Sequence, residues 1–426
     1  MIQQFQHFHH TMRIGIDARM LGPEQGGIGR YIEQLTKNIA DIFCHPRAGG
    51  DPERRDWIPD QVGNDTTNFD FVVFLRKSNW DLVPESPNIK KVLADIPWYG
   101  WKEQIVLPKI IEREKVDLMH FPHWNIPLFY NKPFVVTIHD LLLLHYPTRA
   151  SSTLGPVTYF FKNLAYRAVL NHAIKKAKQI ITPSEFTKND IIKTFNIPAE
   201  KITAIHLGVH SSQFTANSPQ TILEKYKITK PYVLYVGVAY PHKNLEGLVE
   251  AWKMFCAEHG NNYQLVLAGR KNYFYERLEK LLPPPPTHQN LVRCGAVLSL
   301  PLGQGERTPV IFTGFVPDSE LPALYQNAAL YVFPSFYEGF GLPPLEAMQW
   351  GVPVISSNAA CLPEILGNAA HYFNPHDFQA INMAIWSGIS DENLRQTLKL
   401  NAEKLIHNYD WKKTAQSTLG VYGKVI

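Results

Sequence analysis

Two carboxylates in one short segment give the strongest chemical signal in this chain of 426 residues. Glu338 and Glu346 stand eight positions apart in YEGFGLPPLEAM, on either side of a glycine-rich turn. The apolar run 330–333 predicts a buried strand, and Pro343 and Pro344 suit the first turn of a helix. The segment therefore predicts the order strand, glycine turn, helix.

Such a junction is a predicted anion site. Backbone N–H groups and the positive end of the helix dipole point outward at the carboxyl edge of a parallel sheet, where a diphosphate would fit. We expect Glu338 to precede the turn and Glu346 to fall in the first turn of the helix, so that both could bind hydroxyls beside the anion. A nucleotide sugar has hydroxyls on both sides of its diphosphate. The alternative is that Glu346 is a favourable charge near a helix N-terminus and Glu338 a solvated loop residue.

Two basic residues follow other expected strands of the same half. Lys243 lies in GVAYPHKN, after an apolar strand, and would direct a compact positive charge toward a diphosphate. Arg270 follows the strand LVLAG and could add a second charge at the same edge. A solvated loop lysine is the alternative interpretation of Lys243.

A histidine and a glycine loop are the corresponding candidates in the first half. His139 ends the buried strand PFVVTIH at the ligand-facing edge of the first sheet, although a lone histidine there is more often structural. Gly26 and Gly27 follow the first strand, where small residues let the backbone approach a ligand closely; a tight turn is the alternative. The dinucleotide fingerprint G-x-G-x-x-G is absent after this strand, which makes an NAD-dependent dehydrogenase a poor interpretation.

Length and composition indicate an ordinary enzyme. A chain of 426 residues suggests two or three domains with real hydrophobic cores. The formal net charge of +4, from 42 basic and 38 acidic residues, is too slight to predict a nucleic-acid partner but is compatible with a basic patch against an anionic membrane. The four cysteines form no metal-ligand spacing, and no apolar run reaches the length of a membrane span. We expect no metal site, no export signal and a reducing compartment.

Strands and helices alternate in two series along the chain. This is the βαβ rhythm of parallel sheets with both faces covered. It predicts an α/β protein with two Rossmann-like domains, at 12–215 and 228–400, followed by a terminal helix at 401–426.

Three segments are expected to stand outside these domains. Residues 1–11 are interpreted as a disordered leader, with translation starting at Met1 or Met12. Two stretches rich in glycine, proline and charge, 45–67 and 283–309, are interpreted as surface insertions without catalytic function, because lengthening a loop costs little closure entropy. An acceptor-binding loop is the alternative for both.

The segment with the two glutamates resembles the Glu-x7-Glu signature of retaining family 4 glycosyltransferases. The resemblance covers essentially the whole chain outside the leader and the insertions, and it is strongest around 310–375. It implies the GT-B fold, in which two Rossmann-like domains face each other across a cleft. The first domain would bind the acceptor, the second would bind the nucleotide sugar, and the terminal helix would cross back to the first.

The resemblance also implies roles for residues of this chain. Glu338 and His139 would contact the donor sugar, Glu346 would bind the nucleotide ribose, and Lys243 would meet the diphosphate. The backbone amides that would meet the sugar and diphosphate are those of Gly339, Phe340, Gly341 and Leu342.

The implied reaction moves a hexose from a nucleotide diphosphate sugar to a hydroxyl of a glycan or lipid-linked glycan, with retention and without a cofactor. The chain has no Asp-x-Asp pair of the kind that holds a metal ion in other glycosyltransferases, so Lys243, helix N-termini and glycine amides would stabilise the leaving diphosphate. Gly26 and Gly27 match a loop near the donor phosphates and acceptor. The pattern is most like bacterial mannosyltransferases of polysaccharide biosynthesis, which makes GDP-mannose the expected donor and UDP-glucose an alternative. His242 stands where many relatives have arginine.

Two other functions fit the same fold: a nucleotide-sugar epimerase and a degenerate, non-catalytic nucleotide-sugar-binding protein. An epimerase needs acid and base groups around the sugar that the sequence does not place, and a decayed site should have lost some of its four candidate side chains. We expect a cytoplasmic protein that can contact the inner face of a membrane peripherally. Its expected partners are a nucleotide sugar and a glycan or lipid-linked acceptor, without nucleic acid.

Overall fold

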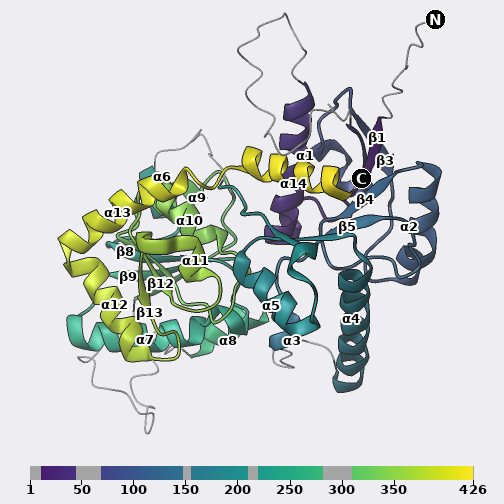
Figure 1. The fold of residues 1–426 in the computed structure, drawn as a ribbon. Helices are drawn as coiled ribbons and strands as arrows, with labels where there is room; N and C mark the ends of the chain where they lie inside the picture. The colour runs from purple at the N-terminus through teal and green to yellow at the C-terminus, as the bar shows by residue number, and fades with distance from the viewer. Residues whose placement is uncertain (1–10, 45–68, 147–154, 210–218, 282–308, 426) are drawn as a thin grey trace, which may run out of the picture. The chain divides into compact units, whose positions relative to one another are not determined.

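The computed structural model describes residues 11–44, 69–146, 155–209, 219–281 and 309–425 (Figure 1). The expected leader lies outside these residues apart from Thr11, the insertion 45–67 lies wholly outside, and the insertion 283–309 does so apart from Pro309. The chain divides into two compact units. Unit 1 comprises Met1–His145, Leu154–Gly208 and Asp410–Ile426, and unit 2 comprises Tyr146–Thr153 and Val209–Tyr409.

Unit 1 is built on a parallel sheet whose strands lie in the order β3-β2-β1-β4-β5-β6-β7. In chain order the strands are β1 (Met12–Asp17), β2 (Phe69–Leu75), β3 (Ile89–Leu93), β4 (Leu118–Phe121), β5 (Phe134–Thr137), β6 (Gln179–Thr182) and β7 (Ile202–Ala204). The α-helices described in this unit are α1 (Gly26–Cys44), α2 (Trp101–Arg113), α3 (Leu142–His145), α4 (Pro156–Lys176), α5 (Glu185–Phe195) and α14 (Trp411–Val425).

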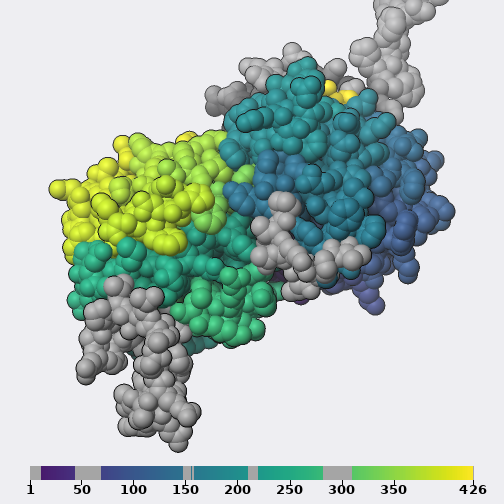
Figure 2. Space-filling view, turned by 90° about the horizontal axis from the view of Figure 1, so that it is seen from below, coloured from purple at the N-terminus to yellow at the C-terminus, as the bar shows by residue number. Residues whose placement is uncertain are grey.

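Unit 2 repeats the plan with strands in the order β10-β9-β8-β11-β12-β13, again all parallel. They are β8 (Tyr232–Val236), β9 (Gln264–Ala268), β10 (Val310–Gly314), β11 (Leu330–Phe333), β12 (Val354–Ser357) and β13 (Ala370–Phe373). The α-helices described here are α6 (Pro219–Lys225), α7 (Leu245–His259), α8 (Tyr273–Lys280), α9 (Leu321–Gln326), α10 (Leu342–Gln349), α11 (Leu362–Leu366), α12 (Phe378–Ser390) and α13 (Glu392–Ile406). Residues 219–281 and 309–409 of this unit, coloured green to yellow, pack together in Figure 2. The expected pair of Rossmann-like α/β domains is confirmed.

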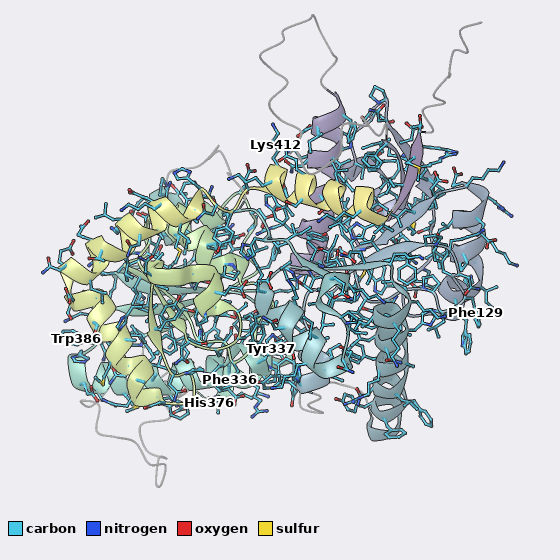
Figure 3. All side chains as sticks on the ribbon, in the orientation of Figure 1. Phe129, Phe336, Tyr337, His376, Trp386 and Lys412 are labelled. Atoms are coloured by element: carbon cyan, nitrogen blue, oxygen red, sulfur yellow. The ribbon has the colours of Figure 1, made fainter. Side chains whose placement is uncertain are left out.

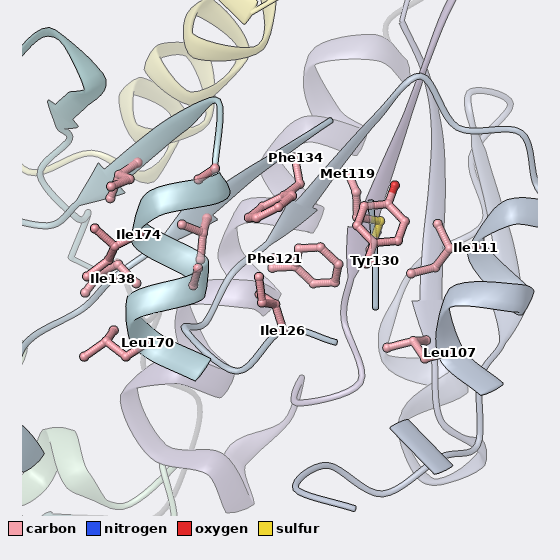
Figure 4. Close-up of a cluster of buried hydrophobic side chains, with 14 of the residues drawn as sticks. Leu107, Ile111, Met119, Phe121, Ile126, Tyr130, Phe134, Ile138, Leu170 and Ile174 are labelled. Carbon is pink, nitrogen blue, oxygen red and sulfur yellow. The ribbon is translucent and has the colours of Figure 1, made fainter. Parts of the chain in front are cut away.

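In the core of unit 1, apolar side chains of β4 and β5 pack against one another and against helices α2 and α4. Alternate residues of a strand face the same side of a sheet, and Phe121 of β4 and Phe134 of β5 pack with their rings 5.7 Å apart. Leu107 of α2 and Leu170 of α4 belong to the same buried cluster (Figure 4). Because β4 and β5 are buried at every position, both faces of the sheet are covered, as the continuous apolar runs predicted.

Several predicted boundaries are wrong. The helix expected over 401–426 is divided, because residues 401–406 complete α13 in unit 2 and α14 begins at Trp411. Helix α6 occupies part of the expected linker between 215 and 228. Strands β3 and β13 were not predicted, since IKKVL carries two lysines and AHYF is only partly buried.

Helix α14 joins unit 1 through a buried chain of polar contacts. The Tyr422 hydroxyl lies 2.6 Å from Nδ1 of His120, whose Nε2 lies 2.8 Å from the Thr137 hydroxyl. That hydroxyl is 3.1 Å from the Tyr31 hydroxyl of α1. The last helix of the chain is thus tied to β4, β5 and α1 of the unit that contains the first strand.

We expect Tyr422→Phe to lower the free energy of unfolding by about 1–3 kcal/mol, because it leaves a buried ring nitrogen of His120 without its hydroxyl partner. Urea unfolding followed by circular dichroism measures the change. Tyr273→Phe is the matched control, since Tyr273 is 58% exposed and the same atom is removed in contact with water. Equal losses in the two variants would contradict the assigned role of the Tyr422 hydroxyl.

Candidate functional site

The strand order of unit 2 defines where a ligand site can form. Strand β8 lies between β9 and β11, so the chain leaves β8 toward one side of the sheet and later returns on the other side. In an open parallel sheet the loops after two such strands separate, and ligands bind at their carboxyl ends. The loop that carries Lys243 follows β8, and the loop that carries Glu338 follows β11.

Lys243 and Glu338 form an ion pair across this switch point. The Lys243 Nζ lies 2.6 Å from Oε1 of Glu338, and the two side chains are 19% and 12% exposed. The contact joins residues 95 positions apart in sequence. The structure therefore brings together two of the side chains singled out from the sequence.

The backbones of the two loops are also joined. Phe336 donates its N–H to the carbonyl of His242 at 2.8 Å. Asn244 is buried in the left-handed conformation at φ 55° and donates its side-chain amide to the carbonyls of Pro334 and Pro375. A polar side chain between these loops thus fixes the backbone that carries the ion pair.

The glycine turn leads directly into α10, as the sequence predicted. Gly341 adopts φ 95°, a conformation that favours glycine, and α10 begins at Leu342 with proline in its first turn. A Cβ on Gly341 would lie 2.9 Å from a methyl group of Leu362, so a larger residue would also displace the end of that side chain. The carbonyl of Phe340 accepts a hydrogen bond from the Cys361 thiol at 3.2 Å. Gly339, Phe340, Gly341 and Leu342 form one continuous path from the loop into the helix.

Glu346 lies in the second turn of α10, so its expected place in the first turn is wrong. The helix already begins at Leu342, which makes Glu346 its fifth residue. Its Oε2 accepts a hydrogen bond from the hydroxyl of Tyr325, which is only 2% exposed, at 3.1 Å. A helix boundary read from the two prolines alone is uncertain by a few residues.

Tyrosine hydroxyls that the sequence analysis missed surround the loop after β8. Tyr275 donates to the carbonyl of Gly237 at 2.7 Å, and Tyr331 donates to the carbonyl of Val236 at 3.4 Å. Burial raises the pKa of both phenols, and nearby Glu346 and Glu338 add to the effect on Tyr331. The phenols therefore stay protonated and act as donors. Their sequence signal was weak, because a tyrosine in an apolar strand, like Tyr331, or on the buried face of a helix, like Tyr275, looks like an ordinary core residue.

Two basic residues near this pair were also considered from the sequence, Arg270 as a second positive charge and His242 as the residue that stands in place of an arginine. The Arg270 guanidinium lies over the ring of Phe315, 5.4 Å from its centroid, instead of joining the Lys243–Glu338 pair. Burial and the charge of Lys243 lower the pKa of His242 to about 4, although Glu338 opposes the change. His242 is therefore neutral at pH 7 and does not replace the charge of an arginine.

His139 lies at the carboxyl edge of the sheet in unit 1, two residues after β5 ends. Its Nε2 is 2.9 Å from the carbonyl of Pro122, and its ring meets Tyr31 edge-on with centroids 5.0 Å apart. Burial lowers the pKa of His139 to about 4, against the opposing effect of the bond to Pro122. The imidazole is therefore neutral at pH 7 and offers hydrogen bonds rather than charge.

The glycine loop is placed differently from the prediction. Gly26 and Gly27 are the first two residues of α1 rather than a loop before it, and both are exposed with open space beside their Cα atoms. Gly29 is buried against the carbonyl of Gly22, where a side chain would collide. The close approach that requires glycine here is thus between two parts of the chain itself.

Within the described residues, no three His, Cys, Asp or Glu side chains gather in a way that could hold a metal ion. An open hollow of about 700 Å³ lies beside α6, lined by Lys227, Lys230 and Asn327 among others. It is at the amino end of β8, opposite the edge that carries Lys243, and so it is not part of the candidate site.

Comparisons with known proteins agree with this architecture. Residues 230–391 match the family Glycosyl transferases group 1, and residues 25–213 match Glycosyltransferase Family 4. The O-antigen chain mannosyltransferase B of Escherichia coli is 31% identical over 309 residues, which are 72% of this chain and 74% of that protein. The O-antigen chain mannosyltransferase RfbU of Salmonella typhimurium is 30% identical over 293 residues, 69% of this chain and 70% of that protein. The structure of Anabaena HepE in complex with UDP-glucose has the same fold, with a TM-score of 0.64, 18% identity and coverage of 97% of this chain and 100% of that chain.

Two Rossmann-like units of this strand order, each matched by a glycosyltransferase family, define a glycosyltransferase with the GT-B fold. The chain belongs to the family 4 glycosyltransferases, among relatives that include bacterial O-antigen mannosyltransferases. Membership supports the transferase over the epimerase and the dehydrogenase.

We expect the thermal stability of the protein to fall between pH 7 and pH 4 because of two buried histidines, His120 and His123, and one partly buried histidine, His139. Burial lowers the pKa of His120 and His123 to about 3 and that of His139 to about 4. The unfolded chain takes up protons near pH 6.5 and the folded chain does not, so folding is opposed by about 1.4 kcal/mol per pH unit for each histidine below that value. Thermal unfolding measured in steps of half a pH unit tests this.

The variant His120→Gln should make this pH dependence shallower. His376→Gln is its control, because His376 is an exposed histidine of unit 2 (Figure 3) and its substitution should leave the slope unchanged. A slope that is identical in the wild type and both variants would show that the buried histidines do not determine it.

Proposed function

We propose that this enzyme transfers mannose from GDP-mannose to a hydroxyl of a growing glycan or lipid-linked glycan, with retention of the anomeric configuration. The observation that carries the proposal is the Lys243–Glu338 pair at the switch point of unit 2, beside the turn that opens α10. Mannose is favoured over glucose because the two similar relatives are named mannosyltransferases. A nucleotide sugar as donor class is supported by the complex of HepE with UDP-glucose.

In the proposed complex the donor lies along the segment from Glu338 to Glu346. The diphosphate meets the backbone amides of residues 339–342 and the ammonium group of Lys243. Glu338 accepts hydrogen bonds from sugar hydroxyls, and Glu346, oriented by Tyr325, accepts them from the ribose. His139 of unit 1, being neutral, hydrogen-bonds the donor sugar. Arg270, held on Phe315, has no assigned contact in this proposal.

The Lys243–Glu338 contact explains how a carboxylate can stand beside a diphosphate. An isolated carboxylate would repel the phosphates, but the ammonium group 2.6 Å away offsets its charge. The pair also holds both side chains in place before the donor binds. Positioning in advance lets Lys243 stabilise the negative charge that grows on the diphosphate as the sugar leaves.

The proposed step breaks the bond between the sugar C1 and the diphosphate oxygen and forms a bond from C1 to the acceptor oxygen. The acceptor attacks the face that the diphosphate leaves, and the acceptor proton passes to the leaving phosphate oxygen. The products are the mannosylated glycan and GDP. We propose no enzymic nucleophile, because the acceptor itself attacks C1, and no cofactor takes part in this step. We propose no metal ion, because the chain lacks an Asp-x-Asp pair and Lys243 supplies positive charge.

We expect GDP-mannose to raise the melting temperature of the wild type in EDTA, and Glu346→Ala to lose most of that shift. Loss of hydrogen bonds from ribose hydroxyls to a carboxylate costs about 1.5–3 kcal/mol, which corresponds to roughly 10- to 100-fold in Kd. Glu403→Ala is the control, since Glu403 is an exposed glutamate of α13 in the same unit. UDP-glucose in parallel tests the alternative donor, and an undiminished shift in Glu346→Ala would refute the ribose role.

We also propose that the enzyme contacts an anionic membrane surface through α4. Phe160, Phe161 and Leu164 are 63%, 62% and 56% exposed, and Lys162 and Arg167 are exposed among them. Figure 1 shows the first half of α4 extending away from the sheet of unit 1. Aromatic and basic side chains together suit the boundary between lipid headgroups and acyl chains. Among the described residues, no helix is both long and apolar enough to cross a membrane.

The double variant Phe160→Ser and Phe161→Ser should bind vesicles of phosphatidylglycerol and phosphatidylethanolamine at least tenfold more weakly than the wild type in a sedimentation assay. Each phenyl group that enters the bilayer contributes about 1.5–3 kcal/mol. Met383→Ser is the control, because Met383 is 61% exposed but lies on α12 of unit 2. If the wild type does not sediment with these vesicles, the proposed contact is wrong.

A further inference from the structure

Exposed aromatic side chains are concentrated in the segment between β3 and α2. Trp98, Tyr99 and Trp101 stand within four consecutive residues, and Tyr99 and Trp101 are 57% and 82% exposed. Because β3 precedes this segment and α2 follows it, the segment lies at the carboxyl edge of the sheet in unit 1. Large aromatic surfaces left in water at a ligand-binding edge indicate a recognition surface.

Tyr99 is held there in a strained conformation. Its φ is 63°, in the left-handed region that residues with a side chain rarely adopt. The strain is maintained by the N–H of Tyr99, which donates to Oε2 of Glu103 at 2.8 Å, and the Glu103 side chain is fully buried. Backbone strain that the surroundings enforce is a feature of functional sites.

Glu103 is in turn fixed by a buried ionic network. Its Oε1 accepts from Arg19 at 2.7 Å, both its oxygens accept from Asn125 at 2.9 Å, and Arg19 makes a bidentate pair with Asp17. These residues come from the end of β1 and the segment after it, from the segment after β4 and from α2. A buried ionic network of this kind adds little to the free energy of unfolding, but it fixes the positions of its side chains. Because Glu103 is fixed, it holds the backbone of Tyr99 at the edge of the sheet.

The aromatic rings form a continuous surface that leads toward His139. Tyr99 and Trp124 lie with centroids 5.6 Å apart and planes 31° from parallel, and Tyr166 supports Trp124 edge-on at 4.7 Å. His123 lies beside Trp124, with centroids 4.8 Å apart, and follows β4. His139 follows β5, which pairs directly with β4. The surface therefore adjoins the residue that we propose for contact with the donor sugar.

We propose that Tyr99 and Trp124, with Trp101 at the rim, form a binding subsite for a pyranose ring of the acceptor glycan. The proposal rests on the proposed glycosyltransferase function and adds where the acceptor binds. The C–H face of a pyranose is apolar and flat, so it can cover an aromatic surface while its hydroxyls stay in water. A surface of this kind selects a sugar chain over a small alcohol, because it contacts a whole ring rather than one hydroxyl.

Transfer from GDP-mannose to α-linked mannobiose tests this subsite, with release of GDP in the absence of acceptor as a measure of the donor half. We expect Tyr99→Ala and Tyr99→Gly to raise KM for mannobiose at least tenfold while GDP release stays within twofold of wild type. Tyr99→Phe keeps the ring and should stay within threefold. Tyr99→Gly also relieves the positive φ, so its melting temperature should not fall although its acceptor binding does.

Phe129→Ala is the matched control, because Phe129 is an exposed aromatic of unit 1 (Figure 3), 64% exposed, outside this cluster. An unchanged KM for mannobiose in Tyr99→Ala and Tyr99→Gly would overturn the subsite. A parallel fall of GDP release and transfer would also overturn it, since Tyr99 would then support the fold or the donor half. If the wild type releases no GDP and transfers no sugar from any nucleotide sugar, the proposed function itself fails.

Discussion

The reversal of strand order in each sheet is the constraint on which the rest of the structure depends. Two consecutive parallel strands can be joined only by a crossover connection, and nearly all such connections are right-handed. The chain therefore fills one side of β8 first and then starts again on the other side with β11. Two loops are left facing each other at that point, and Lys243 and Glu338 lie in them.

Hydrogen bonds and charge then make these loops rigid. Asn244 donates to two carbonyls on other segments, Phe336 bonds to His242 through the backbone, and Tyr275 holds the carbonyl of Gly237. Each contact satisfies a polar group that burial would otherwise leave unpaired, so the loops lose freedom without loss of stability. The chemistry of the site thus rests on contacts that never touch a substrate.

The sequence predicted the features that depend on local pattern. Apolar runs located β8 and β11, glycine and proline located the start of α10, and the spacing of Glu338 and Glu346 identified the segment. Strand β3 was not predicted, because its two lysines interrupt the apolar pattern. The turn of α10 in which Glu346 lies could not be predicted without knowing the first residue of that helix. These are limits of a single sequence read locally.

Long-range partners could not be predicted from the sequence. Arg19 meets Glu103 across 84 positions, and His120 meets Tyr422 across 302. A lone arginine or histidine carries no mark of the residue that it will contact, because the contact exists only after the sheet has assembled. The same holds for Arg270, which shared an edge with Lys243 in the expected fold and instead lies over Phe315.

The return of α14 to unit 1 has a consequence for the order of events during synthesis. Domains usually fold in turn from the N-terminus as the ribosome extends the chain. Here His120 and Tyr31 of unit 1 lack their contacts with α14 until Tyr422 has left the ribosome. The unit that emerges first is thus completed only after unit 2 has been synthesised, and a nascent chain stopped before Tyr422 leaves His120 of that unit without its hydroxyl partner.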